Sequence, residues 1–241
     1  MSASDAIRHQ LEVSERWQDE IQATGLQTQV KALEAFQKER LGDTYADLAQ
    51  LPRYAMATEF FVTDLYAPDN LHERNQQMRR MLPVMFRLLP PSVLDTVALA
   101  LTTQSQAQML DYRTARALRL AHPKEKITDA HYAEAYRESA EPGEREEQIE
   151  HIVAVGESLQ ELVELPMIYQ TLKMCRWPAR VAGLSDLQQF LENGFEAFHE
   201  MQGAEEFLDV IKRREKKVLE QLLGGAEEPF ALPAQVYRAD H

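Results

Sequence analysis

No segment of this sequence alternates apolar and polar residues in the sustained way that a half-buried β-strand requires. Val and Ile, which favour strands, are sparse beside Leu, Ala, Glu and Gln, of which the last three are depleted in strands and all four favour helices. The sequence therefore predicts an all-α fold, built as a single-domain multi-helix bundle.

Proline and glycine residues mark where the predicted helices begin and end. Pro91 and Pro166 stand where a first helical turn tolerates proline, and Gly25, Gly183 and Gly224 stand where helices should end. The predicted helices cover about residues 4–22, 26–40, 44–50, 53–66, 70–88, 92–120, 128–140, 143–164, 166–182, 184–200 and 203–223.

The chain contains no Gly/Ser/Pro-rich linker that would divide it into two domains. We predict one helical domain over residues 1–223 and a C-terminal tail over residues 224–241. The tail carries apolar residues such as Phe230 among prolines and charges, so it either docks on the bundle or frays.

The segment near 53–66 is the predicted centre of the bundle. Its apolar residues point in almost every direction around the helix axis, as expected of a helix buried on all sides. Two charged residues of this segment, Arg53 and Asp64, project in similar directions. Each needs a partner on another helix, because a lone buried charge is too costly to keep.

Several other predicted helices also carry a polar residue on their apolar side. The resulting candidate interior set is Arg53, Asp64, Gln104, Gln108, Asp111, Arg145, Gln148, Arg214 and Glu215. One interpretation is a set of separate interhelical hydrogen bonds and ion pairs. The alternative is one polar cavity able to hold a small ligand, lined by Asp64, Gln104, Gln108, Asp111, Arg145 and Glu215.

A di-metal site of the helical-bundle type would require inward Glu-x-x-His pairs. The chain has one such pair, Glu196 with His199, and Glu147 with His151 misses the spacing by one residue. The helical wheel places all four, together with Glu192, on solvated faces. We therefore predict no metal and no cofactor, and keep a di-metal carboxylate bundle as a weak alternative.

The sequence has no motif typical of an enzyme family. Phosphate-binding Gly-rich loops, the Gly-x-Ser-x-Gly elbow and paired Cys-x-x-Cys motifs are all missing, which leaves the question of catalysis open. The single cysteine, Cys175, shares a helical stripe with Ile168, Leu172 and Ala179. It is predicted to be a small core residue rather than a nucleophile.

The chain carries 39 acidic and 26 basic residues, a formal net charge of −13. Such a field repels phosphate backbones, so we expect no nucleic-acid partner. The longest apolar runs are too short to cross a bilayer, and the first residues lack the apolar core of a signal peptide. These features predict a cytoplasmic protein without a membrane partner.

The run Phe60-Phe-Val-Thr-Asp-Leu-Tyr66, with Gly194-Phe-Glu-Ala-Phe198 and Ile211-Lys-Arg-Arg-Glu215, resembles a family of uncharacterised bacterial all-helical proteins. The resemblance extends from about Arg53 to Leu223. It implies a helical fold and no assigned activity. Thr63 and Ala67 depart from the commoner Glu and Gly of that family, so a family site that used an acid at position 63 would not carry over.

The leading functional hypothesis is a non-catalytic cytosolic helical protein that acts through a protein partner or through self-association, including as a homo-oligomer. It follows from the missing catalytic motifs and the acidic surface. The alternative is a small-molecule-binding or enzymatic bundle with an interior polar site.

Overall fold

The computed structural model describes residues 2–65, 71–123, 126–139 and 141–232, which contain eleven α-helices and no β-strand. The prediction of an all-α fold is confirmed, and the eleven predicted helices occur in the predicted order. They are α1 (Ala3–Ala23), α2 (Gln27–Thr44), α3 (Ala46–Ala49), α4 (Pro52–Glu59), α5 (Leu71–Leu88), α6 (Pro91–Ala121), α7 (Asp129–Ser139), α8 (Pro142–Val163), α9 (Pro166–Val181), α10 (Ser185–Met201) and α11 (Glu205–Gly224). A π-helical stretch, η1 (Phe60–Leu65), follows α4.

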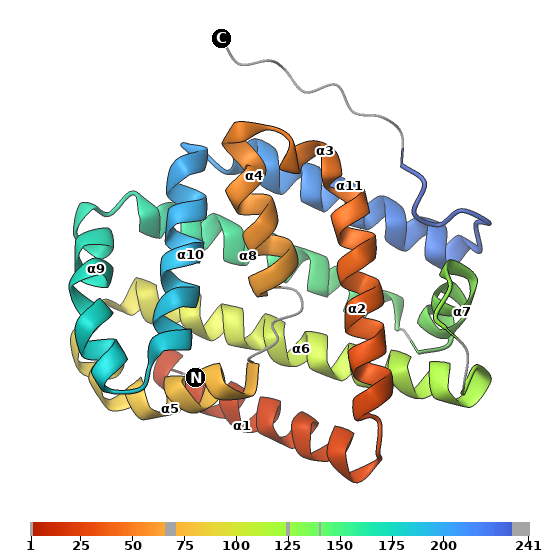
Figure 1. The fold of residues 1–241 in the computed structure, drawn as a ribbon, viewed down its shortest axis with the longest axis horizontal. Coiled ribbons are helices and arrows are strands. Elements are labelled where there is room, and N and C mark those ends of the chain that lie inside the picture. Colours follow the sequence, from red (N-terminus) through yellow and green to blue (C-terminus); the bar gives the residue numbers. More distant parts are fainter. Residues whose placement is uncertain (1, 66–70, 124–125, 140, 233–241) are drawn as a thin grey trace.

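The helices form two crossed layers (Figure 1). In one layer α1, α6, α8 and α11 lie side by side, each in contact with the next. Helices α2, α4 and α10 cross this layer at a steep angle. Helix α7 packs on α6 and α11 at one end of the molecule, and α9 packs on α10 and α8 at the opposite edge.

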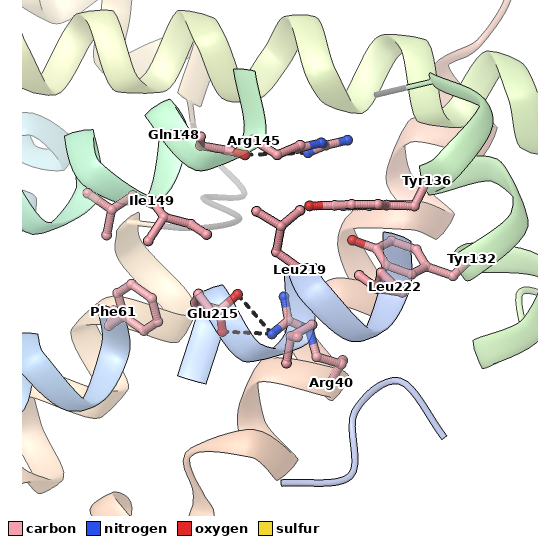
Figure 2. Close-up of a pocket in the computed structure, with 12 residues that line it drawn as sticks. Arg40, Phe61, Tyr132, Tyr136, Arg145, Gln148, Ile149, Glu215, Leu219 and Leu222 are labelled. Carbon is pink, nitrogen blue, oxygen red and sulfur yellow. Dashed lines mark hydrogen bonds and ion pairs between the residues drawn. The ribbon is translucent and has the colours of Figure 1, made fainter. Parts of the chain in front are cut away.

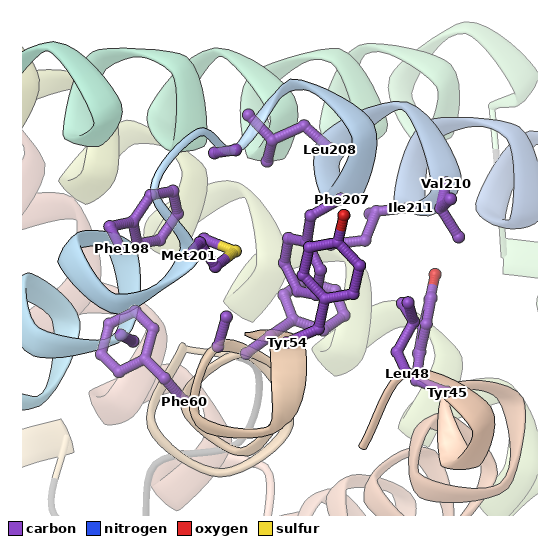
Figure 3. Packing of buried hydrophobic residues seen from close by; sticks show 14 of the residues in the cluster. Tyr45, Leu48, Tyr54, Phe60, Phe198, Met201, Phe207, Leu208, Val210 and Ile211 are labelled. Carbon is purple, nitrogen blue, oxygen red and sulfur yellow. The ribbon is translucent and has the colours of Figure 1, made fainter. Parts of the chain in front are cut away.

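Helix α6 lies within the bundle in contact with α1, α2, α7 and α8, and α10 contacts α4, η1, α5, α8 and α9. The segment predicted near 53–66 is divided into α4 and η1. Its apolar side enters a large group of buried residues, to which Tyr54 and Phe60 belong (Figure 3). Phe61 is buried in the same group. Its opposite side is open to solvent at Met56, which is 44% exposed.

The buried apolar residues gather in three groups. One lies between α4, η1, α10 and α11, a second joins α2, α6, α7 and α11, and a third joins α1, α5 and α6. The described part of the tail supports the second group, because the Phe230 ring lies 6.2 Å from Phe36 and 5.8 Å from Tyr132. The rest of the predicted tail, residues 233–241, lies outside the described residues.

No helix in the described ranges combines the length and the apolar character needed to cross a membrane.

Gly194 allows the close approach of α10 to η1. A Cβ atom at this position would lie 2.8 Å from Cζ of Phe60, which is buried. A buried aromatic ring has few alternative positions, so any side chain here forces the two elements apart. Gly42 is a matched contrast, because it lies within α2 with no atom within 4 Å of its added Cβ.

We expect Gly194→Ala to lower the free energy of unfolding by about 1–3 kcal/mol through overpacking. Gly42→Ala should raise it by up to about 1 kcal/mol, because alanine favours the helix more than glycine does. Urea denaturation of both variants measures the difference. An increase in stability for both variants would show that the contact between α10 and η1 is not tight.

Candidate functional site

A buried ion pair joins the two layers of helices. Arg40 on α2 donates from Nη1 to both carboxylate oxygens of Glu215 on α11, at 2.8 and 3.2 Å. The two side chains are only 6% and 12% exposed. The Tyr45 hydroxyl, at the end of α2, donates to the same carboxylate at 2.9 Å. Glu215 is therefore held by two residues of the opposite layer.

A second arginine of α11 lies beside this pair. Arg214 donates from both terminal guanidinium nitrogens to the carboxylate of Asp47 on α3, and from Nη1 to the Thr44 carbonyl oxygen. Its guanidinium carbon also lies 5.4 Å from the centre of the Tyr45 ring. Arg214 and Glu215, which are consecutive on α11, thus bind residues of opposite charge, Asp47 on α3 and Arg40 on α2.

A third arginine enters from α8. Arg145 is 2% exposed and donates to Thr114 Oγ1 at 2.8 Å and to Gln148 Oε1 at 3.4 Å. Its guanidinium carbon lies 4.3 Å from the centre of the Tyr136 ring. Nearby on α6, Asp111 accepts a hydrogen bond from Gln37 Nε2 at 3.0 Å. We name the six charged residues of this region the arginine–carboxylate cluster: Arg40, Asp47, Asp111, Arg145, Arg214 and Glu215.

Three residues of the cluster, Arg40, Arg145 and Glu215, line a small cavity (Figure 2). Arg145 and Gln148 lie on one side of it, Arg40 and Glu215 lie on the other, and the Tyr136 hydroxyl points into the space between them. The cavity volume is about 20 Å³, which is room for about one water molecule. Pockets for small molecules are usually at least ~300 Å³, so a ligand could enter only if the helices separated.

Burial raises the pKa of two tyrosines and of one carboxyl group in this region. It raises the pKa of Tyr45 well above its ordinary value, and the adjacent Glu215 carboxylate adds to this effect. Burial also raises the pKa of Tyr136 and of Asp111, although the positive charge of Arg145 acts in the opposite direction on both. The tyrosines are therefore neutral hydrogen-bond donors at physiological pH.

A larger hollow of about 300 Å³ is lined by residues of α1, α2, α5 and α6, among them Asp111. Gln108, another residue of the predicted interior set, also lines it. The full lining comprises Gln18, Ile21, Val30, Glu34, Leu71, His72, Glu73, Gln108 and Asp111. Arg145, Gln148 and Glu215 line the small cavity instead, so the predicted set does not surround one common space.

The remaining residues of the predicted interior set bind at separate places. Arg53 donates to the Met201 carbonyl oxygen at 2.8 Å, at the end of α10. The Asp64 carboxylate accepts from Asn193 Nδ2 at 3.3 Å. Gln104 donates to Ser14 Oγ at 3.3 Å and to Asn75 Oδ1 at 3.2 Å, joining α1, α5 and α6.

Arg214 also binds away from the small cavity, at Asp47. The structure thus brings together three of the nine predicted residues, Arg145, Gln148 and Glu215, around one cavity.

The residues of the metal alternative lie on two helices. Glu196 and His199 are on α10, where Glu196 accepts from the Tyr169 hydroxyl at 3.1 Å. On α8, Glu147 and His151 both bind the side chain of Gln106. Within the described ranges, no three or more His, Cys, Asp or Glu side chains form a group that could hold a metal ion.

Two predictions about side-chain exposure are wrong. Glu192 was expected to face solvent, but it is buried beneath α9, where both its oxygens accept from Arg176 Nε at 2.7 Å. Cys175 was expected in the core, but it is exposed. The first error arises because α9 packs against the polar side of α10 and covers Glu192 there. Cys175 lies in the stripe of Ile168, Leu172 and Ala179, but that stripe is not covered at its position.

The outer side of α9 carries apolar residues in contact with solvent. Met167, Met174, Trp177 and Val181 are 68–79% exposed. Their spacing of three, four and seven residues places them on one side of the helix. Elsewhere in the described chain, Met56, Leu120 and Leu191 are exposed singly on different helices, and Val84 and Leu88 form a smaller exposed pair on α5. Leu165, which is 43% exposed, directly precedes α9.

Sequence reasoning missed Arg40, Tyr45 and Gln37, although the sequence contains a signal for two of them. Gln37 and Arg40 continue the apolar stripe of Val30 and Leu33 at intervals of three and four residues. Arg145 was selected because it lies on the apolar side of its predicted helix, and Gln37 and Arg40 meet the same criterion. Tyr45 lies beyond the end of α2, where helical periodicity gives no prediction.

The fold and this cluster define an all-helical protein whose layers are joined by buried arginine–carboxylate contacts. A family model described as "Domain of unknown function (DUF8198)" matches residues 16–229, and the chain belongs to this family. No curated protein and no solved structure matches the chain.

We expect Glu215→Gln to lower the free energy of unfolding by about 3–5 kcal/mol, because it leaves Arg40 buried without its counter-charge. The substitution keeps the size of the side chain. Glu220→Gln is the matched control, since Glu220 lies on the exposed side of α11 and pairs with Lys217 at 2.9 Å. It should change stability by less than about 0.5 kcal/mol. Urea denaturation that gives the two variants equal stability would contradict a structural role for the pair.

Proposed function

We propose that this protein acts by binding another protein through the outer side of α9, without catalysing a reaction. The observation that carries the proposal is the apolar face formed by Met167, Met174, Trp177 and Val181, which are 68–79% exposed. Isolated apolar side chains on a surface are normal, whereas several on one face usually mark an interaction site. Tryptophan and methionine are also enriched where proteins bind each other.

The way in which α9 is attached supports this proposal. Its inner side packs on α10, and Arg176 binds the buried Glu192 there. Tyr169 stacks on Phe195 with 4.9 Å between ring centres. These contacts hold α9 in place from within, so its outer residues are not needed for the packing. The exposed face is thus presented on a supported helix.

A small-molecule function in the interior has less support. It requires Asp64, Asp111, Arg145 and Glu215 to converge on one ligand. Arg145 and Glu215 line a cavity of about 20 Å³, whereas Asp111 lines the separate hollow and Asp64 binds Asn193. A bacterial origin, which the sequence resemblance implies, is compatible with either function.

Site-specific photo-cross-linking in the cells that make the protein tests the proposal. A benzophenone amino acid replaces Met174 in one variant and Leu120 in the other. Leu120 is the matched control, because it is 71% exposed but lies near the end of α6. We expect illumination to join the variant at position 174 to one defined protein, identified by mass spectrometry, and to leave the variant at position 120 unlinked.

Adducts at both positions in equal amount, or at neither, would contradict a docking function of α9. A product of twice 27.7 kDa that contains only peptides of this chain would identify the partner as a second copy.

A further inference from the structure

The charge of α9 is opposite to that of the rest of the molecule. The helix has 16 residues, among which Lys173, Arg176 and Arg180 are basic and none is acidic. The rest of the chain then carries 23 of the 26 basic residues and all 39 acidic ones. The exposed apolar face of α9 therefore lies on a basic helix attached to a strongly acidic protein.

Two of these cations flank the apolar face along one edge. Lys173 precedes Trp177 by four residues and Arg180 follows it by three, so both lie beside the indole on the helix surface. Both are exposed. Arg176 is turned toward α10, where Glu192 and Glu196 lie 2.7 and 3.7 Å from its Nη2 atom. The Lys173 ammonium lies 3.8 Å from the centre of the Tyr169 ring on the same helix. The exposed edge thus carries the charges of Lys173 and Arg180.

We infer that the partner of this face is an acidic amphipathic helix of another protein, an inference that rests on the proposed docking function of α9. A helix of 16 residues is about 24 Å long, so it matches about four turns of a partner helix. Apolar residues of the partner at positions i, i+3 or i+4, and i+7 would contact Met167, Met174, Trp177 and Val181. Its Asp and Glu residues would pair with Lys173 and Arg180.

Charge distinguishes this partner from two other occupants. A second copy whose α9 packs antiparallel on this one, about a two-fold axis perpendicular to both helices, would bring the two basic edges together. An anionic membrane would attract α9 but repel the rest of the chain, which carries an excess of 16 negative charges. An acidic helix contacts only the basic edge of α9, so most of its charge stays farther from the acidic remainder of the chain than an extended membrane surface would, and salt screens that repulsion.

Trp177 provides the measurement, because it is 74% exposed and docking would transfer its indole from water to an apolar contact. The only other tryptophan, Trp17, is replaced by Phe in all proteins tested. The probes are two synthetic helices of equal length and identical leucine spacing, one with Glu and one with Lys at all other positions. We expect the Glu peptide to shift the Trp177 emission to shorter wavelength and to bind at least tenfold more tightly than the Lys peptide.

Two variants separate the contributions of charge and apolar contact. The double substitution Lys173→Glu with Arg180→Glu should reverse the preference, so that the Lys peptide binds more tightly. Met174→Glu should weaken the binding of both peptides by at least tenfold, whereas Leu120→Glu should leave the affinity for both peptides unchanged. Raising the salt concentration should weaken the binding of the Glu peptide most, because salt screens the attraction between exposed charges.

Each alternative outcome overturns the inference in a distinct way. Equal binding of the two peptides excludes selection by charge but leaves α9 as a docking face. A shift that depends only on protein concentration, with a doubled mass, identifies a second copy as the partner. A shift with phosphatidylglycerol vesicles but not with the Glu peptide identifies a membrane surface. If no probe shifts the Trp177 emission, the inference of an acidic helical partner is overturned. Cross-linking at position 174 then decides separately whether α9 binds a protein.

Discussion

The contact between Arg40 and Glu215 is the constraint on which the arrangement of the helices depends. A charged side chain removed from water is tolerable only when it is paired and hydrogen-bonded. Here the arginine lies on a helix of one layer and the carboxylate on a helix of the other, so the charges are neutralised only when the layers cross as they do. Tyr45 adds a hydrogen bond from the same corner, which fixes the position of α11 against α2.

The cluster also explains why the interior is a poor place for a ligand. Its charges are already bound by one another or by neighbouring polar side chains, and the space between Arg40, Arg145 and Glu215 holds about one water molecule. Only Asp111 of the cluster lines the separate hollow of about 300 Å³. We therefore interpret the cluster as structural, and place the function at the edge of the molecule, where α9 exposes an apolar face.

The sequence was sufficient for the helices and for part of the cluster, because both follow from local periodicity. The stripe of α8 that contains Arg145 identified that residue as inward-facing, and the structure places it at 2% exposure. Periodicity says which side of a helix is apolar, but not which helix covers the other side. For that reason Glu192 was assigned to solvent although α9 covers it, and Cys175 was assigned to the core although nothing covers it in the described structure.

Oxidative footprinting of methionine inside the cell tests the central claim, that α9 is covered by another protein where the protein works. Methionine is oxidised according to its exposure, and Met167 and Met174 are 77% and 79% exposed on α9, while Met56 is 44% exposed on α4. In the purified protein the two methionines of α9 should be oxidised faster than Met56. The account predicts that this order reverses in the cell, because a partner protects α9 alone. The same order in the cell and in the purified protein would contradict it.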